Sequence, residues 1–256
     1  MSRRARLVVF GVAAAGVAAA LLLAMLGLPE FGSAVHPYGD RAVAVAVGPE
    51  QTSNVVSSIN FDQRGVDTLG EEFILFGSVI GALVLLRPAS GEHEIGVRRA
   101  GPVLSSTRLD GYLLLPVSLL VGGYIVAYGA ISPGGGFQGG VILATGWHLV
   151  YVAGRYAALR RLVPIGAVEL ADAVGAAAFV AIGLAGVVAA GAFLVNFLPK
   201  GDLGSLLSAG TVPVLNASVG VEVASGVVLL LAAFLEQAVQ IRRDNGQDRA
   251  PDGGAP

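Results

Sequence analysis

The chain has 256 residues, of which 54% are hydrophobic and 13% charged, with a formal net charge of −2 and a mean hydropathy of +0.74. Soluble domains carry about 25% charged residues, so this composition excludes an ordinary soluble domain and indicates a polytopic membrane protein. The absence of cysteine excludes disulfides, thiolate nucleophiles and cysteine-ligated clusters. The three histidines are scattered, so we expect neither a metal site nor a cofactor.

The first apolar run, Leu7–Leu28, contains no charge over 22 residues and follows Arg3, Arg4 and Arg6. About 20 apolar residues cross the hydrocarbon core as a helix. The small residues Gly32-Ser33-Ala34 would suit signal-peptide cleavage, but the run is longer than the usual apolar region of a signal peptide. We therefore expect a retained first membrane helix.

A polar, irregular segment, residues 29–51, separates this run from the next one. Thr52 or Ser53 is expected to cap a short amphipathic helix that lies along the membrane face, and Phe61–Gly65 is expected to form a turn. The pattern T-x-x-E from Thr68 to Glu71 is typical of a capping box and predicts that the second span, Leu69–Leu86, begins there.

Four further spans bring the predicted total to six and make the expected fold an all-α bundle: Tyr112–Ile131, Val141–Ala158, Ala173–Leu198 and Val219–Ile241. Between the last two, Leu203–Ser218 is apolar but interrupted by Gly210, Pro213 and Asn216, so we expect an interfacial or re-entrant segment. The tail, residues 244–256, is rich in glycine, aspartate and proline and is expected to be disordered.

The distribution of basic residues predicts the orientation. With the N-terminus in the cytoplasm, 13 of the 16 lysines and arginines fall on the cytoplasmic side. Both termini are therefore expected in the cytoplasm. The glycine-rich loop described next and the start of the second span would then lie on the outer face.

The connection between the third and fourth spans is unusually rich in glycine. Ser132–Gly140 reads SPGGGFQGG, in which glycine can adopt positive φ angles and proline fixes the entry. No Gly-Lys-Ser/Thr follows, which excludes a phosphate-binding loop. A close-packed structural turn and a docking or pathway loop both remain open. The residues expected to shape it are Pro133, Gly134, Gly135, Gly136, Phe137, Gly139 and Gly140.

The strongest candidates for chemistry are acidic. Asp67 and Glu71 are four residues apart on one helix face, and Glu72 adds a third carboxylate at the mouth of the second span. Helix capping and the helix dipole would explain Asp67 and Glu71. A ring of carboxylates at a mouth would also gather cations or protons. Both readings stay open.

His148 is the only titratable group near the middle of a predicted span. It could relay a proton, or it could be a neutral histidine bonded to a neighbouring helix. Glu169 and Asp172 are expected as dipole-matched residues before the fifth span. Glu222, in the sixth span, could face either the bundle interior or outward.

The sequence shows no nucleophile–base pair, nucleotide motif or basic nucleic-acid patch. We therefore expect neither a self-sufficient enzyme nor a nucleic-acid partner.

Two stretches resemble known families. Ser132–Gly140 resembles the signature loop of the MnhB subunit of the multisubunit cation/proton antiporters of the Mrp type, and the likeness extends loosely over Ser106–Ile241. Asn60–Glu71 resembles a stretch near the C-terminal end of the large A-type subunit, which also occurs in a small subunit of membrane-bound hydrogenases. The implied organisation is a hydrogenase-like two-helix module at 1–88, a cytoplasmic linker at 89–111, an MnhB-like module at 112–243 and the tail.

The resemblance implies an accessory subunit of a large antiporter complex in the plasma membrane, with A-, C- and D-type subunits as partners and Na⁺ or K⁺ exchanged for H⁺. It also implies that Asp67 and Glu71 belong to an acidic pair associated with ion translocation. Many MnhB subunits carry a histidine shortly before the loop, whereas Tyr128–Ile131 has none. This departure weakens a proton relay at the loop. It leaves open two alternatives, a membrane subunit of an energy-converting, hydrogenase-like redox complex and a pure scaffold.

Overall fold

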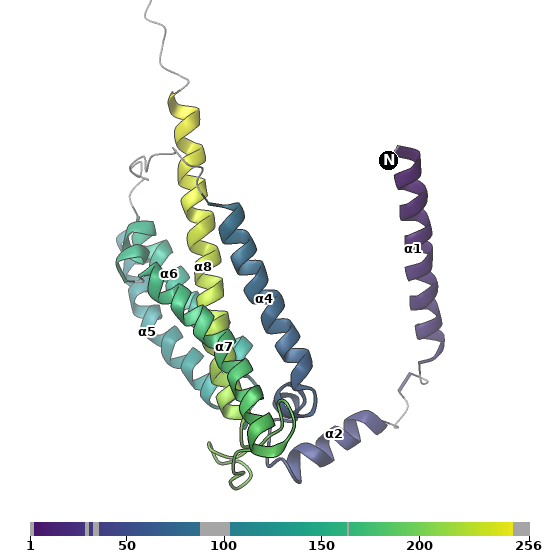
Figure 1. Ribbon diagram of the computed structural model, residues 1–256. Coiled ribbons are helices and arrows are strands. Elements are labelled where there is room, and N and C mark those ends of the chain that lie inside the picture. The colour runs from purple at the N-terminus through teal and green to yellow at the C-terminus, as the bar shows by residue number, and fades with distance from the viewer. Residues whose placement is uncertain (1–2, 29–30, 33–35, 88–102, 163, 248–256) are drawn as a thin grey trace, which may run out of the picture. The chain divides into compact units, whose positions relative to one another are not determined.

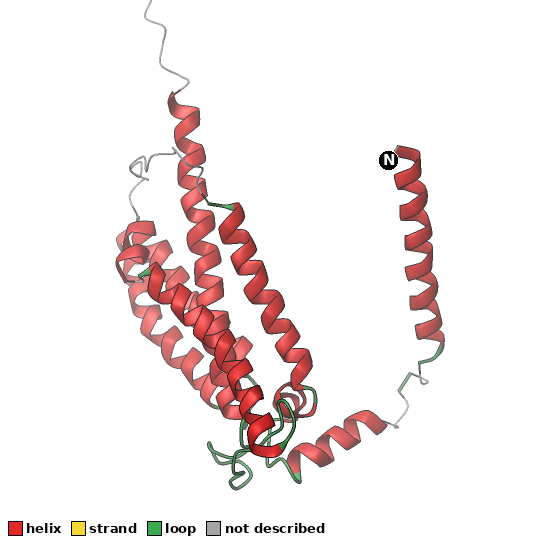
Figure 2. Ribbon diagram, in the orientation of Figure 1, coloured by secondary structure: helices red, strands yellow, loops and turns green. Residues whose placement is uncertain are grey.

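The computed structural model describes residues 3–28, 31–32, 36–87, 103–162 and 164–247, and these residues form helices and loops without a strand (Figures 1 and 2). This confirms the expected all-α fold. The chain divides into two units, residues 1–41 and residues 42–256. The first unit holds α1, Arg3–Leu26, in which no residue is buried. An apolar helix of this kind suits contact with lipid or with other helices.

The second unit holds most of α2 and the other helices: α2 (Pro37–Val47), α3 (Val55–Ser58), η1 (Ile59–Gln63), α4 (Gly65–Leu85), α5 (Ser105–Ala127), α6 (Gly136–Leu162), α7 (Ile165–Ala190) and α8 (Val212–Gln247). Helix α8 packs against α4, α6 and α7, and α5 packs against α6 (Figure 1). Side chains from α4, α6 and α7 can therefore meet those of α8 in the interior of the bundle.

Among the described residues, five helices are long and apolar enough to cross a membrane: α1, α4, α5, α7 and the Val212–Phe234 part of α8. These correspond to five of the six expected spans. The remaining one, Val141–Ala158, lies within the 27-residue helix α6, which is not among the five. Its glycines and the polar residues Gln138 and His148 make α6 less apolar than the others.

Several expected boundaries are wrong. The N-cap of α3 is Asn54, whose side chain accepts a hydrogen bond from the Ser57 N–H, and not Thr52 or Ser53. The expected turn at Phe61–Gly65 is mostly the π-helix η1. The capping box does not form, because α4 already begins at Gly65 and the Thr68 hydroxyl donates to the Asn60 carbonyl at 2.6 Å.

The later helices also begin earlier than expected. Helix α5 starts at Ser105, within the segment predicted as linker, and residues 88–102 lie outside the described part. Helix α8 starts at Val212, so the second half of the predicted re-entrant segment is helical. Pro213 is compatible with this because the first turn of a helix needs no N–H donors. Helix α8 also continues to Gln247, so the first four residues of the predicted tail are helical, and the rest is not described.

Helix α7 ends at Ala190 and not at Leu198, because Gly191 takes a left-handed conformation with φ of 80°. This conformation is typical of the residue after a helix C-terminus. The chain then folds back, and the Leu194 N–H donates to the Gly183 carbonyl at 3.2 Å. Residues 193–200 are thereby held close to the start of α4.

The hydrophobic core lies near this end of the second unit. Phe61 and Phe179 are both buried, with ring centroids 6.3 Å apart, and Leu194, Leu215 and Val219 belong to the same cluster. Glycines allow the helices to approach closely here. A Cβ atom at Gly139 would lie 2.8 Å from the Gly122 carbonyl oxygen on α5.

Candidate functional site

The three predicted acidic residues of α4 fall on two different faces of the helix. Asp67 and Glu71 are exposed, whereas Glu72 is only 2% exposed. Each residue turns the helix by about 100°, so Glu72 shares the inward stripe of Thr68 and Val79. The acidic cluster expected at one mouth is therefore divided between the surface and the interior.

On the exposed face, Asp67 forms an ion pair with Arg64, three residues earlier in the chain. Both side chains are more than half exposed. An exposed pair of this kind contributes about 0–1 kcal/mol, so it is weak evidence for a structural role of Asp67.

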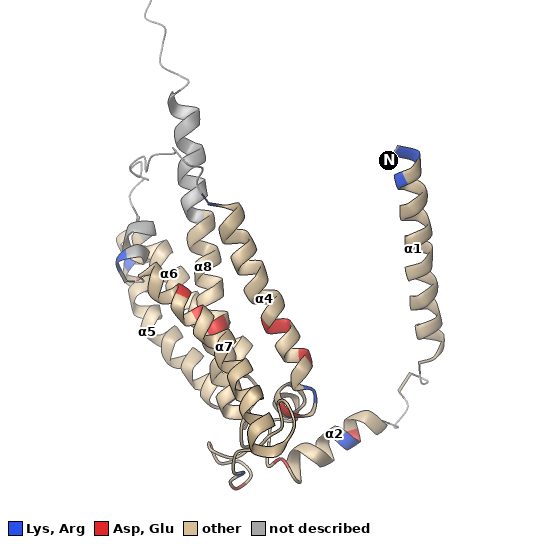
Figure 3. Cartoon of the chain, in the orientation of Figure 1, with Lys and Arg blue, Asp and Glu red and all other residues tan. Residues whose placement is uncertain are grey.

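In the interior, Glu72 meets acidic residues from two other helices. Asp172 of α7 is 3% exposed, and Glu222 of α8 is fully buried. We call Glu72, Asp172 and Glu222 the carboxyl triad. Neither oxygen of Glu72 or Glu222, nor Oδ1 of Asp172, has a hydrogen-bond partner among the described residues. In Figure 3 red bands of acidic residues on α4 and beside α7 are surrounded by tan, uncharged residues.

Two glycines allow this meeting. A Cβ atom at Gly175 of α7 would lie 2.8 Å from both the backbone nitrogen and the Cβ of Glu222, so only glycine lets the helices come this close. The contact is held by the Ser218 hydroxyl, which donates to the Gly175 carbonyl at 3.0 Å. A Cβ atom at Gly226 would lie 3.2 Å from Oδ1 of Asp172, which places Asp172 about one turn beyond Glu222 along α8.

The Glu72 and Glu222 carboxyl groups are close enough to influence each other, and Asp172 is close enough to interact electrostatically with both. No lysine or arginine occurs in Gly65–Leu85, Ile165–Ala190 or Val212–Phe234. An isolated buried carboxylate is very costly, and buried charges are normally paired or neutralised. The triad therefore has to take up protons or cations to remain buried.

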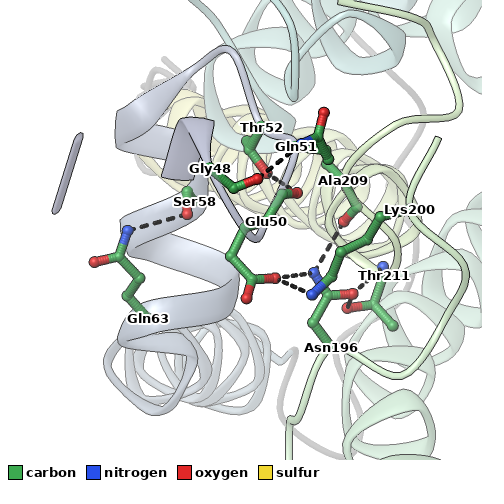
Figure 4. Close-up of polar contacts among 10 residues, drawn as sticks. All are labelled: Gly48, Glu50, Gln51, Thr52, Ser58, Gln63, Asn196, Lys200, Ala209 and Thr211. Atoms are coloured by element: carbon green, nitrogen blue, oxygen red, sulfur yellow. Dashed lines mark hydrogen bonds and ion pairs between the residues drawn. The ribbon is translucent and has the colours of Figure 1, made fainter. Parts of the chain in front are cut away.

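A second polar site lies at the loop end of the same bundle, where a cavity of about 450 Å³ is lined by Glu50, Asp62, Asp67, Asn196 and Lys200 among others. Oε2 of Glu50 accepts hydrogen bonds from Lys200 Nζ at 2.5 Å and from Asn196 Nδ2 at 3.1 Å (Figure 4). We call this the loop-end cavity. The loop-end cavity is therefore lined by both acidic side chains and the basic side chain of Lys200.

Asn196 is fixed in place by its other contacts. Its Oδ1 accepts from the Thr211 N–H at 2.7 Å and from the Thr211 hydroxyl at 3.0 Å, and its amide also donates to the Ala209 carbonyl (Figure 4). On the opposite wall, Gln63 donates to the Ser58 hydroxyl and to the Ala42 carbonyl, both at 3.1 Å. Hydrogen bonds therefore fix the side chains of Asn196 and Gln63, which line the cavity together with Glu50.

The two carboxyl groups of the loop-end cavity differ in acidity. Burial, followed by the neighbouring Glu50, raises the pKa of Asp62 to about 7. Burial would also raise the pKa of Glu50, but the hydrogen bond and charge of Lys200 outweigh it and leave that pKa below its usual value. Near neutral pH the pair can therefore release or accept a proton at Asp62 while Glu50 stays ionised.

The glycine-rich loop is held by two asparagines from distant parts of the chain. Asn54 donates to the carbonyls of Gly129 and Ser132 at 2.8 and 2.9 Å. Asn216 of α8 accepts from the Gly136 N–H at 2.9 Å and donates to the Ser57 hydroxyl at 2.9 Å.

The loop residues themselves lie against the bundle. Gly134 and Gly135 have φ angles of 144° and 138°, which glycine adopts at little cost. Gly136–Gly140 already form the start of α6, and Phe137 packs against the hydrophobic core. Pro133 is exposed. These contacts are those of a close-packed turn.

His148 is half-buried on α6 and lies against the backbone of Val227 on α8, and its buried Nε2 has no hydrogen-bond partner among the residues that the structure describes. It does not join the carboxyl triad, which lies between α4, α7 and α8. Among the described residues, no three histidine, aspartate or glutamate side chains converge to hold a metal ion.

Sequence reasoning did not identify Asp172, Glu222, Glu50, Asp62 or Lys200 as site residues. Asp172 was misplaced because α7 begins at Ile165, so this residue lies inside the helix and not before it. One signal could have found Glu222: it stands in an uncharged run beside Gly220, Ala224 and Ser225, small residues that permit close helix packing.

These features define a helical membrane protein with ionisable groups buried in its bundle. The family follows from residues 108–229, which match a domain described as related to the MnhB subunit of Na⁺/H⁺ antiporter, and the chain belongs to this family. An uncharacterized protein of Methanocaldococcus jannaschii is 30% identical over 210 residues, which are 71% of this chain and 76% of that protein.

Two solved structures are similar over most of the chain. A chain of the membrane-bound sulfane sulfur reductase, an archaeal respiratory membrane complex, has a TM-score of 0.70 and 26% identity over 89% of this chain and 97% of that one. A chain of the Mrp complex from Dietzia sp. DQ12-45-1b has a TM-score of 0.66 and 26% identity over 99% of this chain. This chain spans 27% of the length of that second chain. The separate origin of the N-terminal module stays a prediction, because the family match begins at residue 108.

Proposed function

We propose that the chain is an accessory membrane subunit of a multisubunit Na⁺(or K⁺)/H⁺ antiporter in the plasma membrane, contributing to assembly and to the ion path. The family of residues 108–229 and the similarity to a chain of the Mrp complex support this assignment. The single observation that carries the ion-path role is the carboxyl triad. Ionisable groups inside membrane bundles are rare and costly, and they usually mark ion or proton pathways.

The chain acts with partners and not alone. Its A-, C- and D-type partners would cover apolar surfaces such as that of α1. The proposed role is non-enzymatic. The distribution of arginines favours both termini in the cytoplasm, which would place the loop-end cavity on the outer face.

The test is cation-driven proton exchange by the whole complex in everted vesicles. The variants are Glu72→Gln and Glu222→Gln in the triad and Asp67→Asn and Glu71→Gln on the exposed face of α4. Asp202→Asn, in an exposed turn, is the matched control. We expect exchange to fall strongly in the triad variants while the subunits still co-purify. Normal exchange and assembly in all four variants would contradict the ion-path role.

A membrane subunit of a redox complex is the second candidate. It is favoured by the sulfane sulfur reductase chain, of which 97% is covered. The discriminating measurement is the set of proteins that co-purify in mild detergent. Subunits that carry iron–sulfur clusters would favour the redox complex, and antiporter-type subunits without them would favour the first proposal.

A further inference from the structure

We propose that α4, α7 and α8 form a proton route through this chain, with one proton shared between Glu72 and Glu222 at its centre. The inference deepens the proposed function by naming the ion that this subunit handles. The direction in which protons are exchanged for cations follows from the proposed function, on which the inference rests. Proton sharing itself is a property of the chain and can be measured without any antiporter activity.

The centre of the route is the pair of facing carboxyl groups. Both are buried, at 2% and 0% exposure, and no donor from the described residues reaches their oxygens. An ionised carboxylate can only accept hydrogen bonds, so two of them side by side repel each other. One proton between them removes this repulsion, supplies the missing donor and halves the buried charge.

The surroundings suit a proton better than a metal cation. A hard cation needs several oxygen ligands to replace its hydration shell. The described neighbours of the carboxyl triad include apolar Val79 and the glycines at 175 and 226. Among the described residues, the three acidic side chains are not arranged as a set of ligands that could hold a metal ion. A proton needs only one or two oxygens.

The route continues from the centre towards both ends of the bundle. Asp67 lines the loop-end cavity and precedes Glu72 by five residues, a rise of about 7.5 Å along the helix. In the other direction, Asp172 is followed one turn away by Glu169, which lines a second cavity of about 400 Å³ with Arg87 and Leu229. The buried carboxyl triad therefore lies between two exposed carboxyl groups, Asp67 at one cavity and Glu169 at the other.

A hydrophobic barrier stands between the loop-end cavity and the centre. Leu194 lines the cavity and also belongs to the core cluster that contains Phe61, Phe179 and Val219. Val219 precedes Glu222 by three residues on α8. The route is therefore interrupted by apolar side chains, which would prevent a passive proton leak until a partner or a bound ion shifts them.

The titratable groups near Glu72 and Glu222 come from α4 and α7, and His148 is the candidate on α6. Glu71 of α4 and Asp172 of α7 act on Glu72, and both are acidic. From the side of α6, His148 lies against Val227 and not against the pair. Since these groups supply no positive charge, the negative charge of the pair must be neutralised from outside these groups, and we assign this role to the shared proton.

The experiment is an infrared pH titration of the purified full chain in lipid nanodiscs, in the absence of sodium and potassium. All variants carry Asp62→Asn, because Asp62 itself is partly protonated near neutral pH and would add to the signal. We expect a carboxylic-acid C=O band at neutral pH that shifts in D₂O. The double variant Glu72→Gln/Glu222→Gln should lose it. Glu71→Gln, the adjacent exposed residue, is the matched control and should keep it.

Three results would overturn the shared proton: no such band in the chain that carries Asp62→Asn alone, a band that survives the double variant, or its stoichiometric loss on adding Na⁺. The last would make the pair a cation site. Asp172→Asn keeps the test valid if the double variant misfolds, because it leaves the pair intact and should keep the band while changing its frequency.

The transport consequence is tested separately in the assembled complex. Removing a positioned proton carrier costs on the order of 100-fold in rate, so Glu222→Gln should slow proton movement by that factor while cation binding to the complex persists. If the complex proves not to exchange ions, the proposed function fails and the infrared result still stands. If exchange is normal in Glu222→Gln, the route fails and the antiporter assignment still stands.

Discussion

Gly175 of α7 lies directly against the backbone of Glu222 on α8, where a methyl group at 175 would lie 2.8 Å from the backbone nitrogen of Glu222. Real Cβ atoms do not come this close to backbone, so the absence of a side chain at 175 determines how deeply Glu222 is buried. A change in the packing of α7 on α8 would therefore also change the burial of the Glu222 carboxyl group.

The first prediction concerns this contact. Gly175→Ala should push α7 away from α8 and destabilise the protein by about 1–3 kcal/mol, the usual cost of overpacking a core. Denaturation of the full chain in mild detergent would measure it. Gly166→Ala, on the same helix with no neighbour within 4 Å, should cost nothing. Equal losses in the two variants would contradict the prediction.

The second prediction concerns Asn216, which is fully buried and bonds to Gly136, Ser57 and the Val212 carbonyl. Asn216→Ala leaves the Gly136 N–H and the Ser57 hydroxyl without this partner, at about 1–3 kcal/mol for each buried group left unpaired. Thr145→Ala, which removes only an exposed bond within α6, should change stability by less than about 0.5 kcal/mol. The same detergent denaturation compares the two, and a mild effect at Asn216 would show that the loop does not depend on this bond.

The third prediction is a pH dependence from Asp62. Its pKa rises from 3.8 to about 7 on folding, because of burial and then Glu50, so the folded state binds more protons in this range. The free energy of unfolding should therefore fall as the pH rises from about 4 to about 7. The lowered pKa of Glu50 acts in the opposite direction, mainly below its usual value of 4.5.

Asp62→Asn tests this dependence, because the amide keeps the shape and removes the titration. Thermal unfolding of the full chain in detergent across this pH range should show a smaller slope in the variant, and the carboxyl triad supplies the slope that remains. Asp202→Asn, in an exposed turn, should keep the full slope. An unchanged slope in Asp62→Asn would assign the whole effect to other groups.

The fourth prediction concerns the contact between α5 and α6. In Gly139→Val the added side chain meets the Gly122 carbonyl oxygen, so the two helices cannot keep their spacing, and we expect loss of assembly with the partner subunits. Gly123→Val, on α5 with nothing within 4 Å, should assemble normally. Co-purification in mild detergent measures both. If only glycine variants matter and the acidic variants behave as wild type, the chain is a scaffold.

Hydrophobicity was enough to predict most of the spans, because a stretch of about 20 apolar residues has few other uses. Boundaries were less predictable. Asn216 and Pro213 look like helix breakers, yet Pro213 fits the first turn of α8 and Asn216 points its amide into the loop.

The carboxyl triad could not be predicted from a motif, because its members come from three helices that are far apart in the sequence. One residue of rotation separates the buried Glu72 from the exposed Glu71, and only the packing of α4 on α8 decides which of them faces inward. The loop-end cavity depends in a similar way on the return of the chain after Gly191, where a single left-handed residue redirects it.

The two asparagines that hold the glycine-rich loop belong to segments on opposite sides of residues 88–102. Asn54 comes before this connection, whereas the loop and Asn216 come after it. Cleavage of the peptide backbone there would leave each of these bonds intact. Two separately translated halves would thus retain the recognition surfaces to find one another, and joining them in one gene guarantees equal amounts of both.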